Sequence, residues 1–267
     1  MPEPSTAPPT LDPLMPAFAA FDAARFTHST LIDNEWMPLR PGARWIIDGV
    51  TIEGEERIPH RITFTVTDLT KTIGGVETVV VWIEDFSDGQ LVEKEIAFYA
   101  QDDDGTVWYL GEHPEEFEDG EFVAAPTWVH GVDGAHAGIK MLRDPLNQTQ
   151  TFYQGWGPAV EWSDYGRLDE AGISDCVTFG CFEGTVRFAE SSLGEAGIYQ
   201  LKSYAKGIGE IRVGWRGEAE SMEDLQLKSK ATFKGPKLAD IRRLAIELEK
   251  HAYKVSAETY GDTEPMK

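Results

Sequence analysis

The chain is poor in cysteine and in basic residues. Two cysteines in 267 residues exclude a fold held together by several disulfides. The 24 lysines and arginines face 46 aspartates and glutamates, which gives a formal net charge of −22. A protein that follows the phosphate backbone of a nucleic acid needs a broad basic surface, so we expect no nucleic acid partner.

Long hydrophobic runs are also missing. No stretch approaches the roughly 20 apolar residues of a membrane-spanning helix, so we expect no membrane partner. The N-terminal segment has no basic region, Pro16 interrupts its apolar run and Asp22 follows directly. This pattern does not resemble a secretory signal, and we therefore expect a soluble, cytoplasmic protein.

The two cysteines, Cys176 and Cys181, flank a predicted turn that contains Gly180. They could form a disulfide only if a hairpin placed them face to face. The reducing compartment expected for this chain favours two buried thiols instead.

Alternating apolar and polar residues are abundant, and they are clearest near the middle of the chain. Ile96, Phe98 and Ala100 alternate with more polar neighbours, residues 102–105 form an Asp-rich turn, and residues 106–110 lead back with an aromatic-rich strand. This pattern predicts a β-hairpin.

The same period of two recurs along most of the chain. It predicts further strands at 44–49, 61–67, 79–83, 122–130, 149–154, 160–165, 175–179, 182–189, 197–205, 210–216 and 225–233. Links this short leave little room for crossover helices, so the sheet should be antiparallel. Ten or more such strands favour a closed or half-closed β-barrel, because closure removes exposed edges, with a β-sandwich as the alternative.

Three regions follow from these patterns. Residues 1–30 are expected to form a flexible N-terminal arm with a short helix within 14–26, and residues 31–234 the barrel. Residues 235–267 are expected to form a C-terminal helix and a fraying tail. The candidate anchors of the arm are Phe18, Phe21 and Phe26.

The C-terminal helix is predicted over residues 237–254. Its apolar residues recur every three or four positions, at Leu238, Ile241, Ala245, Leu248 and Ala252. Residues 226–254 contain eight basic and three acidic side chains, a local charge of +5 in an otherwise acidic protein. We therefore expect the helix to dock on the acidic body, in its own chain or in a homodimer.

Four short motifs resemble a group of uncharacterised β-rich bacterial proteins, most of them exported. The first motif is IDN at 32–34 followed by PLRPG at 38–42, and the second is YAQD at 99–102 followed by GTVWYLGE at 105–112. The third comprises Trp128, GVDGA at 131–135, Gly138-Ile139 and Met141, and the fourth is YAKGIG at 204–209. The resemblance covers residues 31–215 and implies a shared fold, but it implies no activity. The chain is expected to depart from the group in two ways, since its N-terminal pattern does not resemble an export signal and since a strand and a helix follow Trp215.

Aromatic side chains suggest a ligand pocket, because several fall where the predicted loops are longest. The candidate ligand-binding residues are Tyr99, Trp108, Tyr109, Trp128, Met141, Tyr153, Trp156 and Tyr204. The competing interpretation is that these residues, like Trp162, simply fill the core.

One histidine suggests acid–base chemistry. His130 ends a predicted strand before a glycine-rich loop, and Asp133 or Glu161 could orient it. His113, His130 and His136 lie close together in sequence but match no zinc-binding spacing, so we expect no metal and no cofactor.

The leading hypothesis is therefore a β-barrel that binds a small, largely apolar or aromatic molecule in its lumen. The alternative is a cofactor-independent lyase, isomerase or hydrolase that uses His130 with Asp133 or Glu161. A third hypothesis is a structural or partner-binding role that rests on the C-terminal helix.

Overall fold

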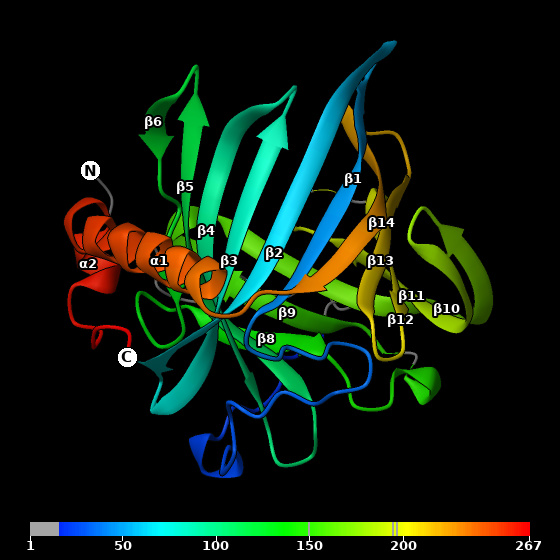
Figure 1. The fold of residues 1–267 in the computed structure, drawn as a ribbon. Coiled ribbons are helices and arrows are strands. Elements are labelled where there is room, and N and C mark those ends of the chain that lie inside the picture. Colours follow the sequence, from blue (N-terminus) through cyan, green and yellow to red (C-terminus); the bar gives the residue numbers. More distant parts are fainter. Residues whose placement is uncertain (1–15, 149, 194, 196) are drawn as a thin grey trace, which may run out of the picture.

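The computed structural model of the chain describes residues 16–148, 150–193, 195 and 197–267. Residues 1–13 of the expected flexible arm lie outside the described residues. In Figure 1 the strands form a tall curved wall, and one long helix lies against its outer side.

The described residues form fourteen strands and two α-helices. The strands are β1 (Ala43–Glu53), β2 (Glu56–Ile73), β3 (Val76–Ser87), β4 (Gln90–Gln101), β5 (Val107–Glu118), β6 (Glu121–Ala124), β7 (Trp128–Val129), β8 (His136–Met141), β9 (Phe152–Gly157), β10 (Trp162–Val177), β11 (Gly180–Ser191), β12 (Tyr199–Ala205), β13 (Gly209–Arg216) and β14 (Ser221–Thr232). The helices are α1 (Pro236–Val255) and α2 (Ala257–Tyr260), with short 3-10 turns at Ala23–Arg25, Pro145–Asn147 and Pro158–Val160.

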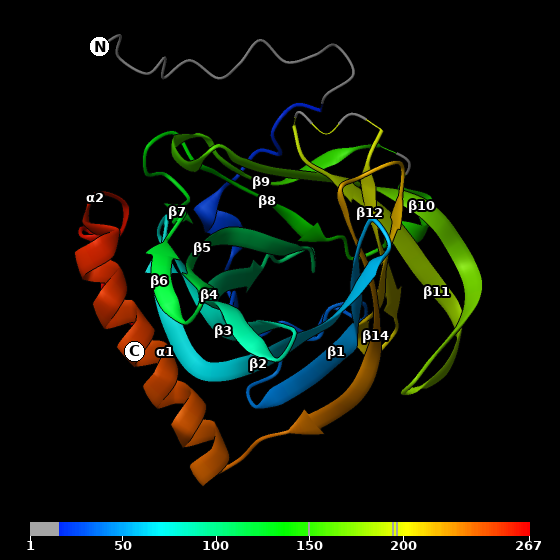
Figure 2. The same ribbon diagram turned by 90° about the horizontal axis from the view of Figure 1, so that it is seen from above.

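Twelve of these strands close into an antiparallel barrel. Their order is β4-β3-β2-β1-β14-β13-β12-β11-β10-β9-β8-β5, and the pairing of β5 with β4 completes the ring. The short strands β6 and β7 pair with β5 outside this ring. Figure 2, a view from above, shows the closed ring of strands. The closed barrel predicted from the alternation is confirmed, and the sandwich alternative is wrong.

The barrel has a core on each side of its wall, because successive side chains of a strand point to opposite faces. On β3, Val79 and Val81 belong to the core inside the lumen, whereas Val80 and Trp82 belong to a second cluster on the outer face. All four are buried. The outer cluster is buried because the C-terminal helices and the N-terminal segment cover it.

The helix α1 begins after Gly235 with Pro236 in its first turn and lies along the outer face of the barrel (Figure 2). Its side chains Ile241, Ala245, Leu248 and Ala252 are buried in the outer cluster. The predicted amphipathic helix is confirmed, and it docks on its own barrel. A homodimer through this helix stays a prediction.

Two ion pairs orient α1 on β2. Arg242 pairs with Asp68 at the surface, and the Lys71 ammonium lies 2.9 Å from the Glu249 carboxylate beneath the helix. The Lys71 side chain is fully buried and the Glu249 side chain is 5% exposed. Burial lowers the pKa of Lys71, and the hydrogen bond to Glu249 opposes that effect.

The C-terminal tail does not fray as expected. The α2 residue Tyr260 is fully buried, the backbone N–H of Met266 donates to Glu249, and Lys267 pairs through its backbone with Thr70. Aromatic packing and backbone pairing hold this segment even though its sequence is polar.

The N-terminal segment differs from prediction in a similar way. Only Ala23–Arg25 is helical, in a short 3-10 turn. The aromatic rings of Phe18, Phe21 and Phe26 nonetheless pack on the barrel's outer face against residues such as His136 and Trp108. Aromatic contacts rather than a helix therefore attach this segment.

Most predicted strands are longer or shifted in the structure, and two of them are divided or joined differently. The strand expected at 122–130 is divided into β6 and β7, with Pro126 between them. The strand expected at 175–179 is the end of the longer β10, and residues 178–179 form the turn into β11.

A disulfide joins Cys176 to Cys181 across the β10–β11 hairpin, where the two residues are direct register partners. The expected pair of free thiols is therefore wrong. Structural disulfides form in oxidising compartments and are rare in the cytoplasm, so the expected cytoplasmic location is also contradicted. None of the described helices is both long enough and apolar enough to cross a membrane.

Candidate functional site

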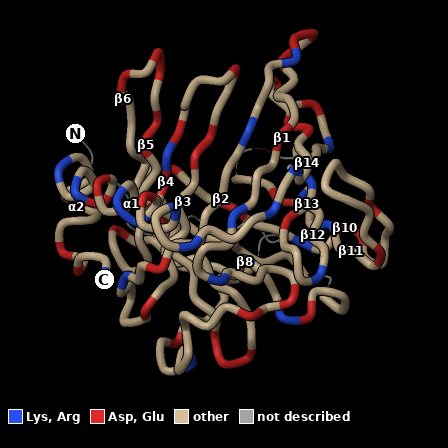
Figure 3. Tube along the Cα trace, viewed as in Figure 1, with Lys and Arg blue, Asp and Glu red and all other residues tan. Residues whose placement is uncertain are grey.

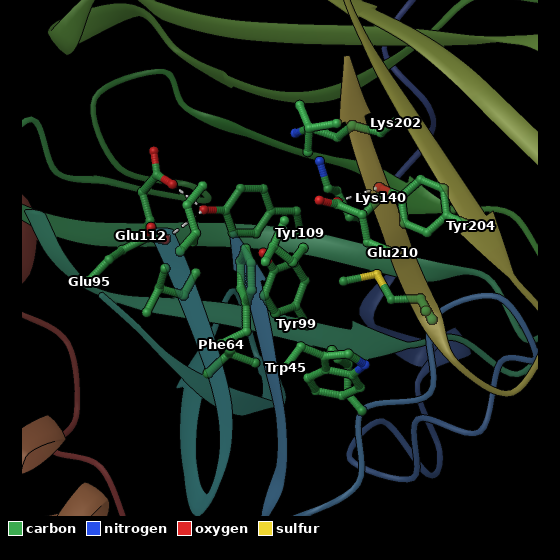
Figure 4. A pocket seen from close by; sticks show the side chains of 18 of the residues that line it. Trp45, Phe64, Glu95, Tyr99, Tyr109, Glu112, Lys140, Lys202, Tyr204 and Glu210 are labelled. Carbon is green, nitrogen blue, oxygen red and sulfur yellow. Dashed lines mark hydrogen bonds between the residues drawn. The ribbon is translucent and has the colours of Figure 1, made fainter. Parts of the chain in front are cut away.

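The barrel lumen contains a cavity of about 290 Å³. Apolar side chains form much of its wall, among them those of Trp45, Ile47, Phe64, Val81 and Val213. The indole Nε1 of Trp45 donates to the backbone carbonyl of Ile208 at 2.7 Å, which fixes this ring in the wall. Polar groups enter the cavity from two opposite sides (Figure 4).

The β4–β5 hairpin supplies one polar side. Tyr99 on β4 and Tyr109 on β5 are direct cross-strand partners, and their rings stack with centroids 4.7 Å apart and planes 11° from parallel. Cross-strand aromatic pairs stabilise a sheet. This pair also fixes the position of the Tyr109 hydroxyl group.

An irregularity in β5 brings a carboxyl group to the same side. The register shifts between Phe98 and Tyr99, so that Gly111 rather than Leu110 is the partner of Phe98. Gly111 has a φ of 146°, which favours glycine. The extra residue places Glu112 in the cavity wall beside Tyr109.

Close packing holds Glu112 in place. The indole Nε1 of Trp128 donates to Glu112 at 2.9 Å. The Trp128 ring stacks on Trp162 with centroids 4.7 Å apart. Gly155 and Gly157 leave room for it, since a Cβ at either position would lie 2.8 Å from Trp128.

Two carboxyl groups share one phenol in this part of the cavity. The Tyr109 hydroxyl lies 3.1 Å from Glu95 and also bonds to Glu112. Burial raises the pKa of Glu95 well above its usual range, and the nearby Glu112 raises it further. Burial also raises the pKa of Glu112, while hydrogen bonds from Tyr109 and Trp128 oppose this. The two groups therefore retain a proton more readily than an exposed pair would.

The opposite side of the cavity carries two lysines. The Lys202 ammonium lies 2.9 Å and the Lys140 ammonium 3.4 Å from the Glu190 carboxylate. Gln154 donates to Glu190 at 2.7 Å. Burial opposes ionisation of Glu190, but the two lysines outweigh it and lower the pKa of Glu190 to about 2.

A second tyrosine–glutamate contact lies beside these lysines. The Tyr204 hydroxyl is 3.2 Å from Glu210, and both residues line the cavity (Figure 4). Burial raises the pKa of Glu210, and Lys202 partly opposes this effect. Asp164 behaves in the same way, with burial raising its pKa and Lys140 opposing.

The structure brings part of the predicted ligand-binding set together. Tyr99, Tyr109 and Tyr204 line the cavity. Trp128 and Met141 are buried in the core inside the lumen, and Trp128 supports the wall through its bond to Glu112.

The other predicted ligand-binding residues lie away from the cavity. Trp108 packs in the outer cluster against Phe21, and its Nε1 donates to Asp102 at 3.0 Å. Tyr153 and Trp156 are buried against Phe18. These three aromatic rings contact the N-terminal segment.

The predicted acid–base residues do not meet. His130 packs against Phe21, and its Nδ1 accepts a hydrogen bond from the backbone N–H of Ala137 at 3.0 Å. Burial lowers the pKa of His130, and His136 lowers it further. Asp133 and Glu161 are exposed, and within the described residues neither forms a hydrogen bond or ion pair with His130.

The histidines considered as metal ligands are also separate. His113 bonds to Thr127 and Glu115 beneath the C-terminal helices, whereas His136 stacks on Phe18. In the described ranges no group of three or more His, Cys, Asp or Glu residues is placed to hold a metal ion.

Sequence reasoning missed most of the charged and amide groups that line the cavity, among them Glu95, Glu112, Lys140, Lys202 and Glu210. The alternation of side chains between the two faces of a strand would have indicated some of these residues. Glu95 lies on the same face of β4 as Tyr99, and Lys202 on the same face of β12 as Tyr204.

The chain matches no protein-family model and no curated protein. It is structurally similar to a candidate exported protein with a YmcC-like fold from Bacteroides fragilis, with 10% identity, a TM-score of 0.44, and coverage of 74% of this chain and all of the other. A candidate lipoprotein from Parabacteroides distasonis has 11% identity, a TM-score of 0.39 and the same coverage, 74% and 100%. Neither description names an activity.

Proposed function

We propose that the barrel binds a small, largely apolar or aromatic molecule in its lumen. The observation that carries this proposal is the cavity of about 290 Å³ with an apolar wall and a few converging polar groups. Ligand sites in proteins are concave and mostly apolar, and a small number of placed polar groups orient the ligand in them. A molecule near the size of a substituted benzene or naphthalene suits this volume.

The wall is arranged to hold such a molecule without large rearrangement. Trp45 is held by its bond to Ile208, and Tyr109 is held by its stacking on Tyr99. A ligand that enters a preformed site loses less free energy to ordering of the protein. The rigid aromatic wall therefore favours binding over a structural role for the barrel.

We further propose that the chain belongs to the β-rich bacterial family that its motifs resemble. The motif at 99–102 and 105–112 builds the β4–β5 pair, which supplies Tyr99, Tyr109 and Glu112 to the cavity. The acid–base enzyme hypothesis built on His130 has no comparable support, since Asp133 and Glu161 lie in the solvent.

A fluorescence titration with 2-naphthol tests the binding proposal. Trp45 and Trp162 line the cavity, so binding should quench tryptophan emission in a saturable way. Val81→Phe places a larger side chain in the cavity wall and should weaken binding about tenfold or more. The matched control is Val123→Phe, the same substitution at a residue on β6 that is 48% exposed.

The expected pattern is saturable binding in the wild type and in Val123→Phe, with a clear loss in Val81→Phe. Circular dichroism and thermal unfolding would establish that each variant keeps the fold. Binding that is unsaturable, or equal in the wild type and a folded Val81→Phe variant, would overturn the proposal.

A further inference from the structure

Six acidic side chains are buried within the part of the chain that the structure describes: Glu95, Asp102, Glu112, Glu115, Glu190 and Glu249. Four of them pair with a lysine or an arginine. The distances are 3.3 Å from Asp102 to Arg25, 3.0 Å from Glu115 to Lys94, 2.9 Å from Glu190 to Lys202 and 2.9 Å from Glu249 to Lys71.

The two exceptions are Glu95 and Glu112. No described Lys, Arg or His lies within 4.0 Å of either carboxyl group. They are also the two that lie next to one another, joined by the Tyr109 hydroxyl, and both line the lumen cavity. Burying a carboxylate without a cation is costly, so this arrangement leaves a site for positive charge that the chain itself does not fill.

The aromatic rings beside these carboxyl groups suit a cation. Tyr99, Tyr109 and Trp162 all line the cavity, and the Trp162 ring meets that of Tyr109 edge-on at 6.0 Å. An ammonium group near the face of an aromatic ring is attracted by the ring's electron density. Carboxyl groups and aromatic rings together therefore favour an organic cation.

The lysines across the cavity do not supply the missing charge. Lys140 and Lys202 both bond to Glu190, and Asp164 and Glu210 lie near Lys202. Figure 4 shows Lys140 and Lys202 beside Glu210, on the other side of the cavity from the Glu95–Glu112 pair. Their charge is already matched by these acidic neighbours.

One end of the barrel is also strongly acidic. Figure 3 shows acidic residues at the tips of the β1–β2, β3–β4 and β5–β6 hairpins. These tips carry Glu53, Glu55, Glu56, Asp85, Asp88, Glu116, Glu118, Asp119 and Glu121. Clustered charge of one sign raises the local concentration of ions of the opposite sign, so this end should attract cations.

We propose that the lumen takes a small organic cation, an amine whose ammonium group lies between Glu95 and Glu112 and whose apolar body lies against the aromatic wall. This inference rests on the proposed function and adds the charge of the ligand. An ammonium group can donate to both carboxyl groups, and such charge-assisted hydrogen bonds are stronger than neutral ones.

Three probes of one shape test the inference by calorimetry. Phenethylamine is a cation at pH 7, 2-phenylethanol is neutral and 3-phenylpropionate is an anion, while all three carry a phenyl ring on a short chain. The inference predicts that the amine binds about tenfold or more tightly than the alcohol, and that the anion binds weakest. This comparison needs only the wild-type protein.

The variant Glu95→Gln with Glu112→Gln keeps the shape of both side chains and removes their charge. It should reduce the affinity for phenethylamine to that for 2-phenylethanol and leave the alcohol almost unaffected. Glu77→Gln is the control, since Glu77 is exposed on β3 next to the β2–β3 turn, does not line the cavity and lies outside the acidic hairpin tips.

Equal or tighter binding of the alcohol or the anion would overturn the inference and leave the proposed function intact. Failure of all three probes, together with unsaturable 2-naphthol binding, would overturn both. An amine preference that survives in the folded double variant would also overturn the assignment to Glu95 and Glu112.

Discussion

Glu95 and Glu112 are buried in the barrel lumen and contact the same hydroxyl group, that of Tyr109. They come from neighbouring strands, and a one-residue irregularity at Gly111 is needed to bring them together. The wild-type barrel must therefore hold a proton or bind a cation at this place to fold without a large electrostatic cost.

This relationship predicts that stability falls as the pH rises above about 4.5. Burial raises the pKa of Glu95, and burial together with Glu112 raises the pKa of Glu93 to about 8. For each of these two glutamates, at a pH between its ordinary pKa and its raised pKa in the folded protein, the folded state binds more protons than the unfolded state. The free energy of unfolding must then decrease with pH across this window.

The variant Glu95→Gln should remove part of this decrease and gain about 1–3 kcal/mol over the wild type at pH 8. At pH 4, where the carboxyl group is mostly protonated in both states, the two proteins should differ much less. Urea unfolding at several pH values measures the difference. A constant difference between variant and wild type from pH 4 to pH 8 would mean that Glu95 is not perturbed.

The buried ion pair under α1 gives a second prediction. Glu249→Gln leaves the fully buried Lys71 ammonium without its carboxylate, and we expect a loss of about 3–5 kcal/mol. The matched control is Glu247→Gln, two residues away. Glu247 pairs with Arg243 on the exposed face of the helix, so its loss should cost about 0.5 kcal/mol or less.

Equilibrium denaturation of both variants checks this prediction. Similar stability losses in Glu249→Gln and Glu247→Gln would show that the pair with Lys71 is not buried in solution and that α1 is only loosely docked.

The disulfide gives a third prediction. Intact protein should show no reactive thiol after denaturation without reductant, and two after reduction, because Cys176 and Cys181 are joined. The loop between them is short, so Cys176→Ser with Cys181→Ser should cost about 2 kcal/mol. Two thiols in unreduced, denatured protein would contradict both the disulfide and the oxidising compartment inferred from it.

The glycines behind Trp128 give a fourth prediction. A Cβ at Gly155 would lie 2.7 Å from Trp162 and 2.8 Å from Trp128, so Gly155→Ala must displace their stacked rings. We expect a loss of about 1–3 kcal/mol and weaker 2-naphthol binding. Gly214→Ala on β13 is the control, because no atom lies within 4 Å of the added Cβ. Equal effects of the two substitutions would refute the proposed support of the cavity by Trp128.

The barrel could be predicted from the sequence because its signal is local. The alternation along β4 and β5 and the apolar stripe of α1 each follow from a short stretch of residues. Which face of each strand points into the lumen was harder to predict. Trp108 and Tyr109 are adjacent, so only one of them can point into the lumen, and the pattern does not say which.

The acidic part of the site could not be read from the sequence. In a chain with a net charge of −22, most glutamates are exposed, so neither Glu95 nor Glu112 stands out by residue type. Strand alternation places Glu95 on the face of Tyr99, but it does not do so for Glu112. Glu112 is three residues from Tyr109, and the regular alternation of a strand would place these two side chains on opposite faces. Only the irregularity at Gly111 reverses that parity, and it depends on the pairing of β5 with β4.

The most direct test of the lumen site is a crystal of the protein soaked with 4-bromophenol and measured at the bromine absorption edge. If the lumen binds small aromatic molecules, one strong anomalous peak should lie inside the barrel, in the cavity lined by Trp45, Phe64 and Tyr109. At saturating probe, an empty lumen or bromine sites on the outer surface alone would contradict the proposed binding.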